Sequence, residues 1–579
     1  MPGKGLVRVR RGINGFVGQT NRLLLLAVAL ALVFHLALML TGAYRWSYDA
    51  YAHMFFADHY VRSWFGLWEP RWFGGFYVTT YPPLVHQGLA LLSLGLGLEA
   101  AYQVLSLLLL VLIPVAVYCF ARVFVSDESA GYASLLSVFL PSIGQAVYFL
   151  GQLTTLFGLV SCLFASACLY RFLNGGKVVD FALTVSLLGV SVGSHHFSAL
   201  FLLPLCLLLS LVMAVLGSLD TVGWRRIVSR LVWVLVLGGL VCLMVVYPFW
   251  MFLLGAEMQA PIHHGSRVVF SNSGWADVYF WNIHGVFLIF MPLTCLFTVK
   301  YRRLFPLFSA GFFMFVMGLG GTTPLPSIFG KWWQWLVYDR FALWAGFLLL
   351  PISGLICRLT WDRLTRFKLG KLLLIVLLVS LAVNCWWVSN LAVYFGHPRE
   401  VGLQEVKAFL DGDGRWRWRY LTLGFGEAQL ARLSMMVNAT TLDGTYYTGR
   451  MLPVLRHSGL GIIDGSKYSY ELLGEGGLTL LNTVLSDASS YSLKWVFCSD
   501  PFYEPILEAH DFGRLCTLSD GVTTVWYREG VPMLGLRVFE RSEVSVVGLV
   551  WGTAPVTCLL SAVFLLFYKR WFALSTLIG

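Results

Sequence analysis

The sequence predicts a mainly α-helical membrane protein with about twelve transmembrane helices and one α/β domain held outside the membrane. The first observation is composition: of 579 residues, 58% are hydrophobic and 12% are charged, and the mean hydropathy is +0.73. Soluble proteins carry about 25% charged residues. The second observation is that apolar runs able to cross a ~30 Å hydrocarbon core recur along most of the chain. The third is that this pattern stops over residues 395–542.

Each expected span is an apolar stretch between polar loops. The first one follows a basic N-terminus. Its run of about 21 apolar residues exceeds a signal-peptide core and has no small-residue cleavage site after it, so we expect it to stay uncleaved. The expected spans cover approximately residues 22–42, 99–121, 129–150, 154–171, 179–195, 198–217, 231–254, 278–298, 304–320, 341–357, 372–394 and 543–567.

The basic residues predict the orientation of these spans. They occur in every second connection and in both tails, and cytoplasmic loops are the ones enriched in Lys and Arg. Both termini are therefore predicted to be cytoplasmic, and the net charge of +11 requires no nucleic-acid partner. The basic segments contain Lys4 to Arg11, Arg122, Arg171 with Lys177, Arg225 to Arg230, Lys300 to Arg303, Arg358 to Lys371, and Lys569 with Arg570.

A long first outer loop, residues 43–98, follows from this orientation, within a transmembrane domain of residues 1–394. The apolar piece 84–97 inside the loop has about 14 residues, which is short for a span. Counting it as a span would move Arg122 and Arg171 to the outer side. We therefore expect a re-entrant or interfacial helix there.

The second outer segment, residues 395–542, mixes helix-like patterns such as "LQEVKAFL" with strand-like patterns such as "KWVFCSD". This alternation favours a small extracytoplasmic α/β domain. Residues 543–579 then form the final transmembrane helix and a cytoplasmic tail. Cys498 and Cys516 fall in the outer domain and could form a disulfide, which their spacing alone does not decide. Asn438 begins a glycosylation sequon, "NAT".

Histidines and acidic residues gather on the predicted outer side of the membrane. Ionisable groups are costly at membrane depth, so this clustering favours a functional site over simple solvation at the interface. His195 with His196, and His263 with His264, could donate hydrogen bonds to phosphate oxygens or shuttle protons. Zinc binding is the weaker alternative, because adjacent histidines rarely bind one ion together. No metal ligands are predicted.

The stretch "YRWSYDAYAHMFFADHY", residues 44–60, holds the most unusual pair. On a helix, Asp49 and His53 share one face, with aromatic residues around them. Asp58 and Arg62 share the opposite face at i,i+4, the spacing of an ordinary ion pair. A carboxylate beside an imidazole on an apolar wall suits a general base. The alternative for Asp49 is an acidic residue that stabilises a helix N-terminus.

The same loop continues as "WEPRWFGGFYVTTYPPLVHQ". It contains a W-x-P-x-W-x-x-G pattern and a Y-P-P-L pattern. Together with the basic tail, the single span and the acidic residue just beyond it, these patterns make the sequence resemble the GT-C class of integral-membrane glycosyltransferases. Within that class the sequence is most similar to the prokaryotic membrane proteins labelled "6-pyruvoyl-tetrahydropterin synthase-related". The likeness covers the first eleven spans by arrangement and residues 44–88 by motif.

The resemblance implies a polyprenyl-phosphate-linked sugar as donor and Asp49 as the base that acts on the acceptor hydroxyl. Arg340 is implied as a clamp on the lipid phosphate, because a guanidinium grips phosphate oxygens bidentately. The alternatives are that Arg340 pairs with Asp339 or snorkels, and that the clamp is Arg45, Arg267 or Lys331. Tyr81 of the Y-P-P-L pattern is a further candidate substrate contact, and the aromatic segment 321–335 could cover a sugar or a lipid tail.

The first loop lacks the paired acidic residues or DxD of many such enzymes, so no cofactor is predicted and a divalent cation stays open. The predicted function is transfer of a sugar to a glycan, glycolipid or glycoprotein at the outer face of the cell membrane. One alternative is a transporter or flippase for lipid-linked sugars, which the absence of inverted repeats and the small number of charges within the spans disfavour. A non-catalytic scaffold for envelope assembly is the other.

Overall fold

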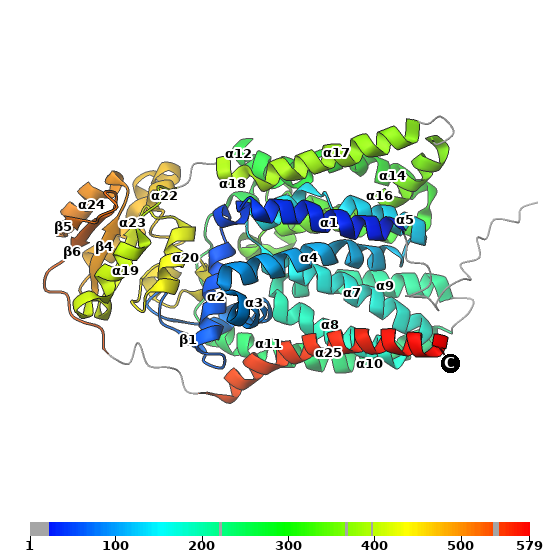
Figure 1. Cartoon of the computed structure of the whole chain (residues 1–579), viewed down its shortest axis with the longest axis horizontal. Coiled ribbons are helices and arrows are strands. Elements are labelled where there is room, and N and C mark those ends of the chain that lie inside the picture. Colours follow the sequence, from blue (N-terminus) through cyan, green and yellow to red (C-terminus); the bar gives the residue numbers. More distant parts are fainter. Residues whose placement is uncertain are drawn as a thin grey trace, which may run out of the picture.

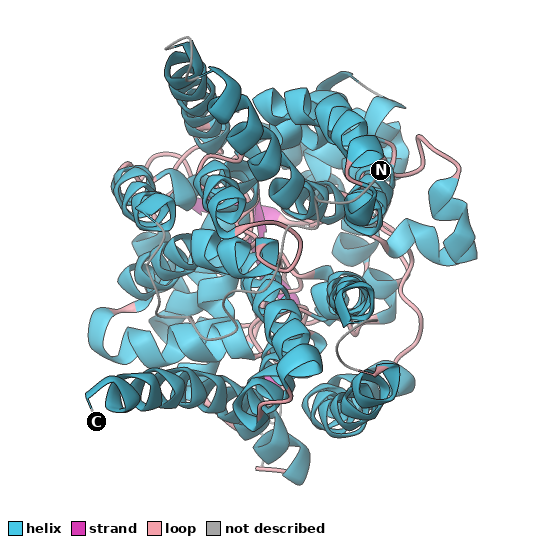
Figure 2. Cartoon of the chain, turned by 90° about the vertical axis from the view of Figure 1, so that its right-hand side faces the viewer, coloured by secondary structure: helices cyan, strands magenta, loops and turns pink. Residues whose placement is uncertain are grey.

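The computed structural model describes residues 22–218, 223–271, 273–364, 369–394, 398–535 and 544–578. Long helices run side by side in a bundle, and a smaller domain with a β-sheet sits at one end of it (Figure 1). Figure 2 shows the bundle turned by 90°. Of the residues used to predict orientation, Lys4 to Arg11, Arg366 and Lys368 lie outside the described residues.

The predicted membrane character is confirmed. Among the described residues, nine helices are long and apolar enough to cross a membrane, or ten if the bent pair Asp127–Ser137 and Pro141–Phe149 is one span. The nine are α1 (Arg22–Leu40), α4 (Leu98–Ala121), α7 (Leu153–Gly175), α9 (His196–Ser218), the segments Trp224–Gly255 and Gly274–Lys300, α16 (Asp339–Leu364), α17 (Leu369–Ser389) and α25 (Val546–Ile578).

The two other predicted spans, 179–195 and 304–320, correspond to helices that are shorter than the rest. They are α8 (Val178–Ser194) and α15 (Phe305–Met317). Helix α8 packs against α7 and α25, and α15 packs against α16, so both belong to the bundle. The predicted number of twelve is reached only if these two helices also cross the membrane.

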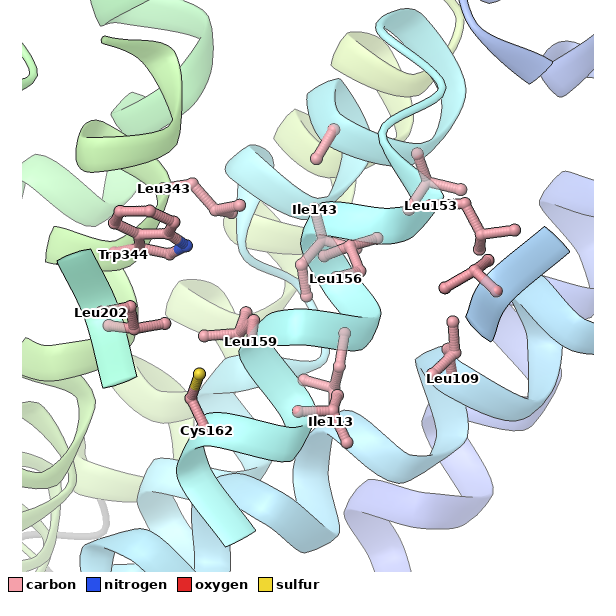
Figure 3. Close-up of a cluster of buried hydrophobic side chains, with 14 of the residues drawn as sticks. Leu109, Ile113, Ile143, Leu153, Leu156, Leu159, Cys162, Leu202, Leu343 and Trp344 are labelled. Atoms are coloured by element: carbon pink, nitrogen blue, oxygen red, sulfur yellow. The ribbon is translucent and has the colours of Figure 1, made fainter. Parts of the chain in front are cut away.

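Helix α7 lies at the centre of the bundle because it is apolar on every side, as expected for a helix buried among others. It packs against α4, α8 and α9. Leu156, Leu159 and Cys162 of α7 point toward Ile113 of α4 and Leu202 of α9 in the apolar cluster of Figure 3. Ser166 Oγ and Ser210 Oγ lie 2.6 Å apart across the α7–α9 contact. Small and hydroxyl residues of this kind hold membrane helices together, since apolar burial gains little within lipid.

The first outer loop folds into two helices around a short hairpin. Helix α2 (Ala50–Arg62) is followed by β1 (Trp68–Glu69), β2 (Phe76–Tyr77) and α3 (Leu84–Leu96), with β1 and β2 antiparallel. Helix α3 is the short apolar piece predicted at 84–97, and it packs on α2 and α4. The predicted Asp58–Arg62 ion pair is confirmed at 2.7 Å.

The outer domain is α/β, as predicted. Its four-stranded sheet has the order β3-β4-β6-β5, in which β3 and β4 are parallel and the other neighbours antiparallel. Cys498 ends β4 and Cys516 lies in β5, with β6 between them, and both thiols are free. The strands are β3 (Arg419–Leu423), β4 (Leu493–Cys498), β5 (Gly513–Thr517) and β6 (Thr524–Tyr527). The helices include α19 (Leu403–Asp411), α20 (Glu427–Met436), α22 (Ser466–Leu473), α23 (Thr479–Ser486) and α24 (Glu504–Ala509).

The outer domain is docked on the first outer loop through the residues of the W-x-P-x-W-x-x-G pattern. The backbone N–H of Thr441 donates to Arg71 O at 2.9 Å, and that of Gly74 donates to Thr441 O at 2.9 Å. Trp72 Nε1 donates to Ser434 Oγ of α20 at 2.9 Å. Main-chain pairing and a buried indole bond together fix the position of the domain relative to the loop.

Candidate active site

Asp49 is the N-cap residue of α2, and its side chain makes no capping hydrogen bond to the helix. Its backbone N–H and that of Tyr48 donate to Leu150 O and Phe149 O, each at 3.2 Å. The close approach requires glycine at 151, where φ is +72° and a Cβ would lie 2.9 Å from the backbone N of Asp49. The Asp49 carboxylate is half-buried, and within the described residues it accepts no hydrogen bond.

Asp339 and Arg340, the first two residues of α16, lie beside Asp49. Gln152 Nε2 donates to Asp339 Oδ2 at 2.6 Å, while Oδ1 is buried without a partner. The Arg340 guanidinium stacks over the Phe197 ring at 5.5 Å, and its Nε is buried without a partner. In the described part of the chain Arg340 forms no ion pair with Asp339. A buried, unpaired donor of this kind is costly unless a ligand satisfies it.

These neighbours set the pKa of Asp49. The pKa is about 6 instead of the ordinary 3.8, because burial raises it most, Arg340 lowers it and Asp339 raises it. A carboxyl group with this pKa is ionised at neutral pH and still basic enough to take up a proton. The charge of Arg340 acts on Asp49, so the predicted base and the predicted phosphate clamp lie near each other.

His53 follows Asp49 by one turn, but its ring contacts a different residue. Nδ1 of His53 lies 3.0 Å from Nε2 of His86, and the two rings stack at 5.2 Å. Burial, with a smaller contribution from Arg340, lowers the pKa of His53 to about 4. His53 is therefore neutral at physiological pH, and it contacts Asp49 through its backbone N–H, which donates to Asp49 O at 3.0 Å.

The four paired histidines divide into two groups. His195 and His264 face the site, because the charge of Arg340 acts on both. His195 Nδ1 lies 2.7 Å from Ser198 Oγ, and His264 Nδ1 lies 2.8 Å from Ser266 Oγ. The other two lie in different surroundings: His196 packs on Phe249 at 4.4 Å, and His263 is exposed beside Trp275 at 5.2 Å.

Among the three other candidate clamps, Arg267 lies nearest the site, because it acts electrostatically on His264. Burial lowers the pKa of Arg267 to about 10, and its Nε is buried without a partner. Arg45 instead pairs with Glu99 at 3.2 Å in an exposed ion pair. Lys331 is exposed in the 3₁₀ segment Leu325–Trp335.

Tyr81 closes one side of the site together with the outer domain. Its hydroxyl lies 3.1 Å from Thr154 Oγ1, and its ring stacks on that of Tyr446 at 4.3 Å. The Tyr446 hydroxyl donates to Thr80 O at 2.8 Å. The outer domain thus reaches the candidate site directly.

Glu427, the first residue of α20, is, like Tyr446, a residue near the site that the sequence did not predict. The pKa of this carboxyl is raised to about 7, because burial raises it most, its own backbone N–H lowers it, and the charges of Asp464, Asp49 and Asp443 raise it. Its proximity to Asp49 depends on how the outer domain docks on the first loop. No local pattern in the sequence carries that information.

A divalent cation was left open by the sequence. Across the described ranges, no group of three or more His, Cys, Asp or Glu side chains is arranged to hold a metal ion. Asp49 and Asp339 provide two carboxylates close together, a number with which Mg²⁺ is bound when substrate phosphates and water complete its ligands. The residues present therefore do not form a complete cation site by themselves.

No protein-family model and no curated protein sequence matches the chain. Among solved structures, the chain is similar to the oligosaccharyltransferase of Archaeoglobus fulgidus in the apo form, with a TM-score of 0.51 and 12% identity, covering 82% of this chain and 69% of that one. It is also similar to the arabinofuranosyltransferase AftD from mycobacteria, with a TM-score of 0.51 and 13% identity, covering 88% of this chain and 40% of that one. Both likenesses show the GT-C fold.

Proposed function

We propose that this protein is a membrane glycosyltransferase that moves a sugar from a polyprenyl-phosphate carrier to a hydroxyl-bearing acceptor, with Asp49 as general base. The proposal rests mainly on two neighbouring side chains whose polar atoms lack hydrogen-bond partners. Asp49 has a carboxylate without a hydrogen-bond partner in the described residues, and the neighbouring Arg340 has a buried Nε without one. The GT-C fold and the two sugar-transferring neighbours support the same class of reaction.

In the proposed step the acceptor hydroxyl attacks the anomeric carbon of the donor sugar. The new glycosidic C–O bond forms as the bond from that carbon to the phosphate oxygen breaks. The proton of the hydroxyl passes to Asp49, and the electron pair of the broken bond leaves with the polyprenyl phosphate. A base with a pKa near the working pH is suited to this transfer.

Arg340 is proposed to bind the phosphate, where negative charge develops as the carrier leaves. Stabilising that charge is the largest contribution that fixed donors make in such reactions. Arg267 and His264 stand close enough to share this role, and His195 and Tyr81 line the same space. His53 is assigned a positioning role, since its ring lies one turn from Asp49 and is anchored on His86.

The deciding experiment compares purified wild type with Asp49→Ala and Asp49→Asn on a panel of polyprenyl-phosphate sugars, following both transfer and donor hydrolysis. Both variants are expected to lose at least about 100-fold in rate, the lower range for general-base catalysis. Asp277→Asn is the matched control, because Asp277 is an exposed carboxylate on the predicted outer side. Wild-type rates in both Asp49 variants would show that the base is assigned wrongly.

A further inference from the structure

The loop that follows α11 (Gly239–Gly255) carries two of the residues proposed to bind the donor phosphate, His264 and Arg267. The far end of this loop is fixed on the membrane domain. The backbone N–H of Gly321, in the segment that leads to α16, donates to Arg267 O at 2.5 Å. Gly320 has φ +59°, and a Cβ there would lie 2.5 Å from the same carbonyl oxygen, so the two backbones are in close contact.

The near end of the loop is held by the outer domain. Arg456, the last residue of α21 (Pro453–Arg456), is 7% exposed and bonds the loop through both its side chain and its main chain. Its Nε donates to Glu257 O, and its own O accepts the backbone N–H of Ala260 at 2.9 Å. Its Nη1 donates to Arg450 O at 2.7 Å, so the guanidinium is also bonded within the outer domain.

Arg450 in turn fixes the part of the outer domain that carries Arg456. Its side chain is fully buried, and its guanidinium donates to three main-chain carbonyls: Nη1 to Leu460 O at 2.7 Å and to Leu455 O at 3.3 Å, and Nη2 to Gly461 O. Hydrogen bonds from a charged donor are the stronger ones, so residues 455–461 form a well-held turn. Arg456 therefore contacts the loop from a fixed position.

The other contacts at the near end of the loop are weaker. Trp335 Nε1 donates to Gln259 O at 3.2 Å, which is a single bond from a neutral donor. His457 Nε2 and Glu257 Oε2 lie 3.2 Å apart, but both side chains are largely exposed, and exposed ion pairs contribute little to stability. Arg456 is thus the main connection between this loop and the outer domain.

His264 lies between the two ends, four residues beyond Ala260 and three before Arg267. Its Nδ1 accepts the backbone N–H of Ser266 at 3.2 Å and lies 2.8 Å from Ser266 Oγ. Because Nδ1 is the acceptor, the neutral ring carries its proton on Nε2. Within the described residues this Nε2–H forms no hydrogen bond, so it is available to donate to a phosphate oxygen.

We propose that Arg456 is a positioning residue for the donor site: by holding Glu257 and Ala260, it places His264 where its Nε2–H binds the phosphate of the carrier. The inference rests on the proposed function, which supplies that phosphate. The outer domain would then take part in donor binding through a residue that itself makes no contact with the donor.

The test measures binding of undecaprenyl phosphate, the probe for the carrier, to the full-length protein in detergent. Arg456→Met is expected to weaken binding by about 10-fold, the order of one hydrogen bond to a charged group. Arg528→Met is the matched control, because Arg528 Nη1 donates to Leu485 O and Ser486 O of its own domain, at 2.8 and 3.2 Å, and it should bind as wild type does. Equal binding by wild type and Arg456→Met would overturn the proposal.

A double-mutant comparison separates positioning from a general structural role. His264→Ala should also weaken binding of the probe. Adding Arg456→Met to that variant should then cause little further loss, because no ring is left to position. If Arg456→Met causes the same loss in the His264→Ala background as in wild type, Arg456 acts elsewhere and the proposal is wrong.

Ala260→Pro tests the same contact from the side of the loop, and it decides the matter if Arg456→Met does not fold. Proline has no N–H to donate to Arg456 O, and the outer domain itself is unchanged. Weaker binding of the probe supports the proposal, and wild-type binding contradicts it. A wild type that neither binds undecaprenyl phosphate nor transfers a sugar would instead overturn the proposed function, and this inference with it.

Discussion

Arg71 and Glu69 form a bidentate ion pair in the interior, with Nε to Oε1 and Nη2 to Oε2 both at 2.7 Å. Both side chains are buried, and the backbone N–H of Arg71 also donates to Glu69 Oε1 at 2.9 Å. His59 Nδ1 lies 3.0 Å from Glu69 Oε2, and Asp58 is the second carboxylate on Arg71. This network lies beneath the docking surface of the outer domain, because Arg71 Nη1 also donates to Ser434 O of α20 at 3.3 Å.

Replacing Arg71 by Met should destabilise the folded protein strongly. The change leaves the Glu69 carboxylate buried without its main counter-charge, and breaking such a pair costs about 3–5 kcal/mol. Arg45→Met, which breaks the exposed pair with Glu99, should cost about 0–1 kcal/mol. Unfolding of both variants in detergent, followed by tryptophan fluorescence, measures the difference. Equal stability of the two variants would contradict the role given to the buried pair.

Replacing Gly151 by Ala should reduce activity through displacement of Asp49. The backbone at 151 has φ +72°, and the added Cβ would lie 2.8 Å from the backbone N of Ala50 and 2.9 Å from that of Asp49. A displacement of about 1 Å at a catalytic group can cost 100-fold in rate. Sugar transfer is the measurement. Gly95→Ala is the control, since a Cβ there meets nothing within 4 Å, and wild-type transfer by Gly151→Ala would refute the argument.

The side of the membrane on which the outer domain lies can be tested with Cys516. This thiol is free and exposed, whereas Cys498 is free and buried. If the basic loops are cytoplasmic, a membrane-impermeant maleimide should label Cys516 in intact cells, and Cys516→Ser should abolish that labelling. Labelling that requires permeabilised cells would place the domain on the cytoplasmic side and reverse the predicted orientation.

Much of the fold could be predicted because hydropathy is a local property of the sequence. Apolar runs located the helices of the bundle, and the i,i+4 rule identified the Asp58–Arg62 pair, which forms at 2.7 Å. The predicted span 179–195 matches α8 to one residue at each end, whereas α15 ends at Met317, short of the predicted 304–320, because helix ends depend on packing against neighbours.

The candidate site could be predicted only in its separate parts. Asp49 was singled out from helix geometry and predicted sidedness, and Arg340 from the resemblance to GT-C enzymes, and the fold brings them close together. The His53–His86 contact and the approach of Glu427 to Asp49 are non-local, and no spacing rule reports them. Geometry on one helix suggested that His53 orients the Asp49 carboxylate, whereas its ring contacts His86 at 3.0 Å because α3 packs on α2.

The pH dependence of transfer should show an acidic limb near pH 6, because Asp49 must be deprotonated to act as base and burial raises its pKa to about 6. Arg340 lowers that pKa, so Arg340→Gln should move the limb to higher pH. Asp339 raises it, so Asp339→Asn should move the limb to lower pH. Profiles of kcat/KM scaled to their own maxima separate these shifts from any loss of donor binding, and Asp277→Asn should leave the limb in place. Shifts of the same sign in the Arg340 and Asp339 variants would mean that another group controls the limb.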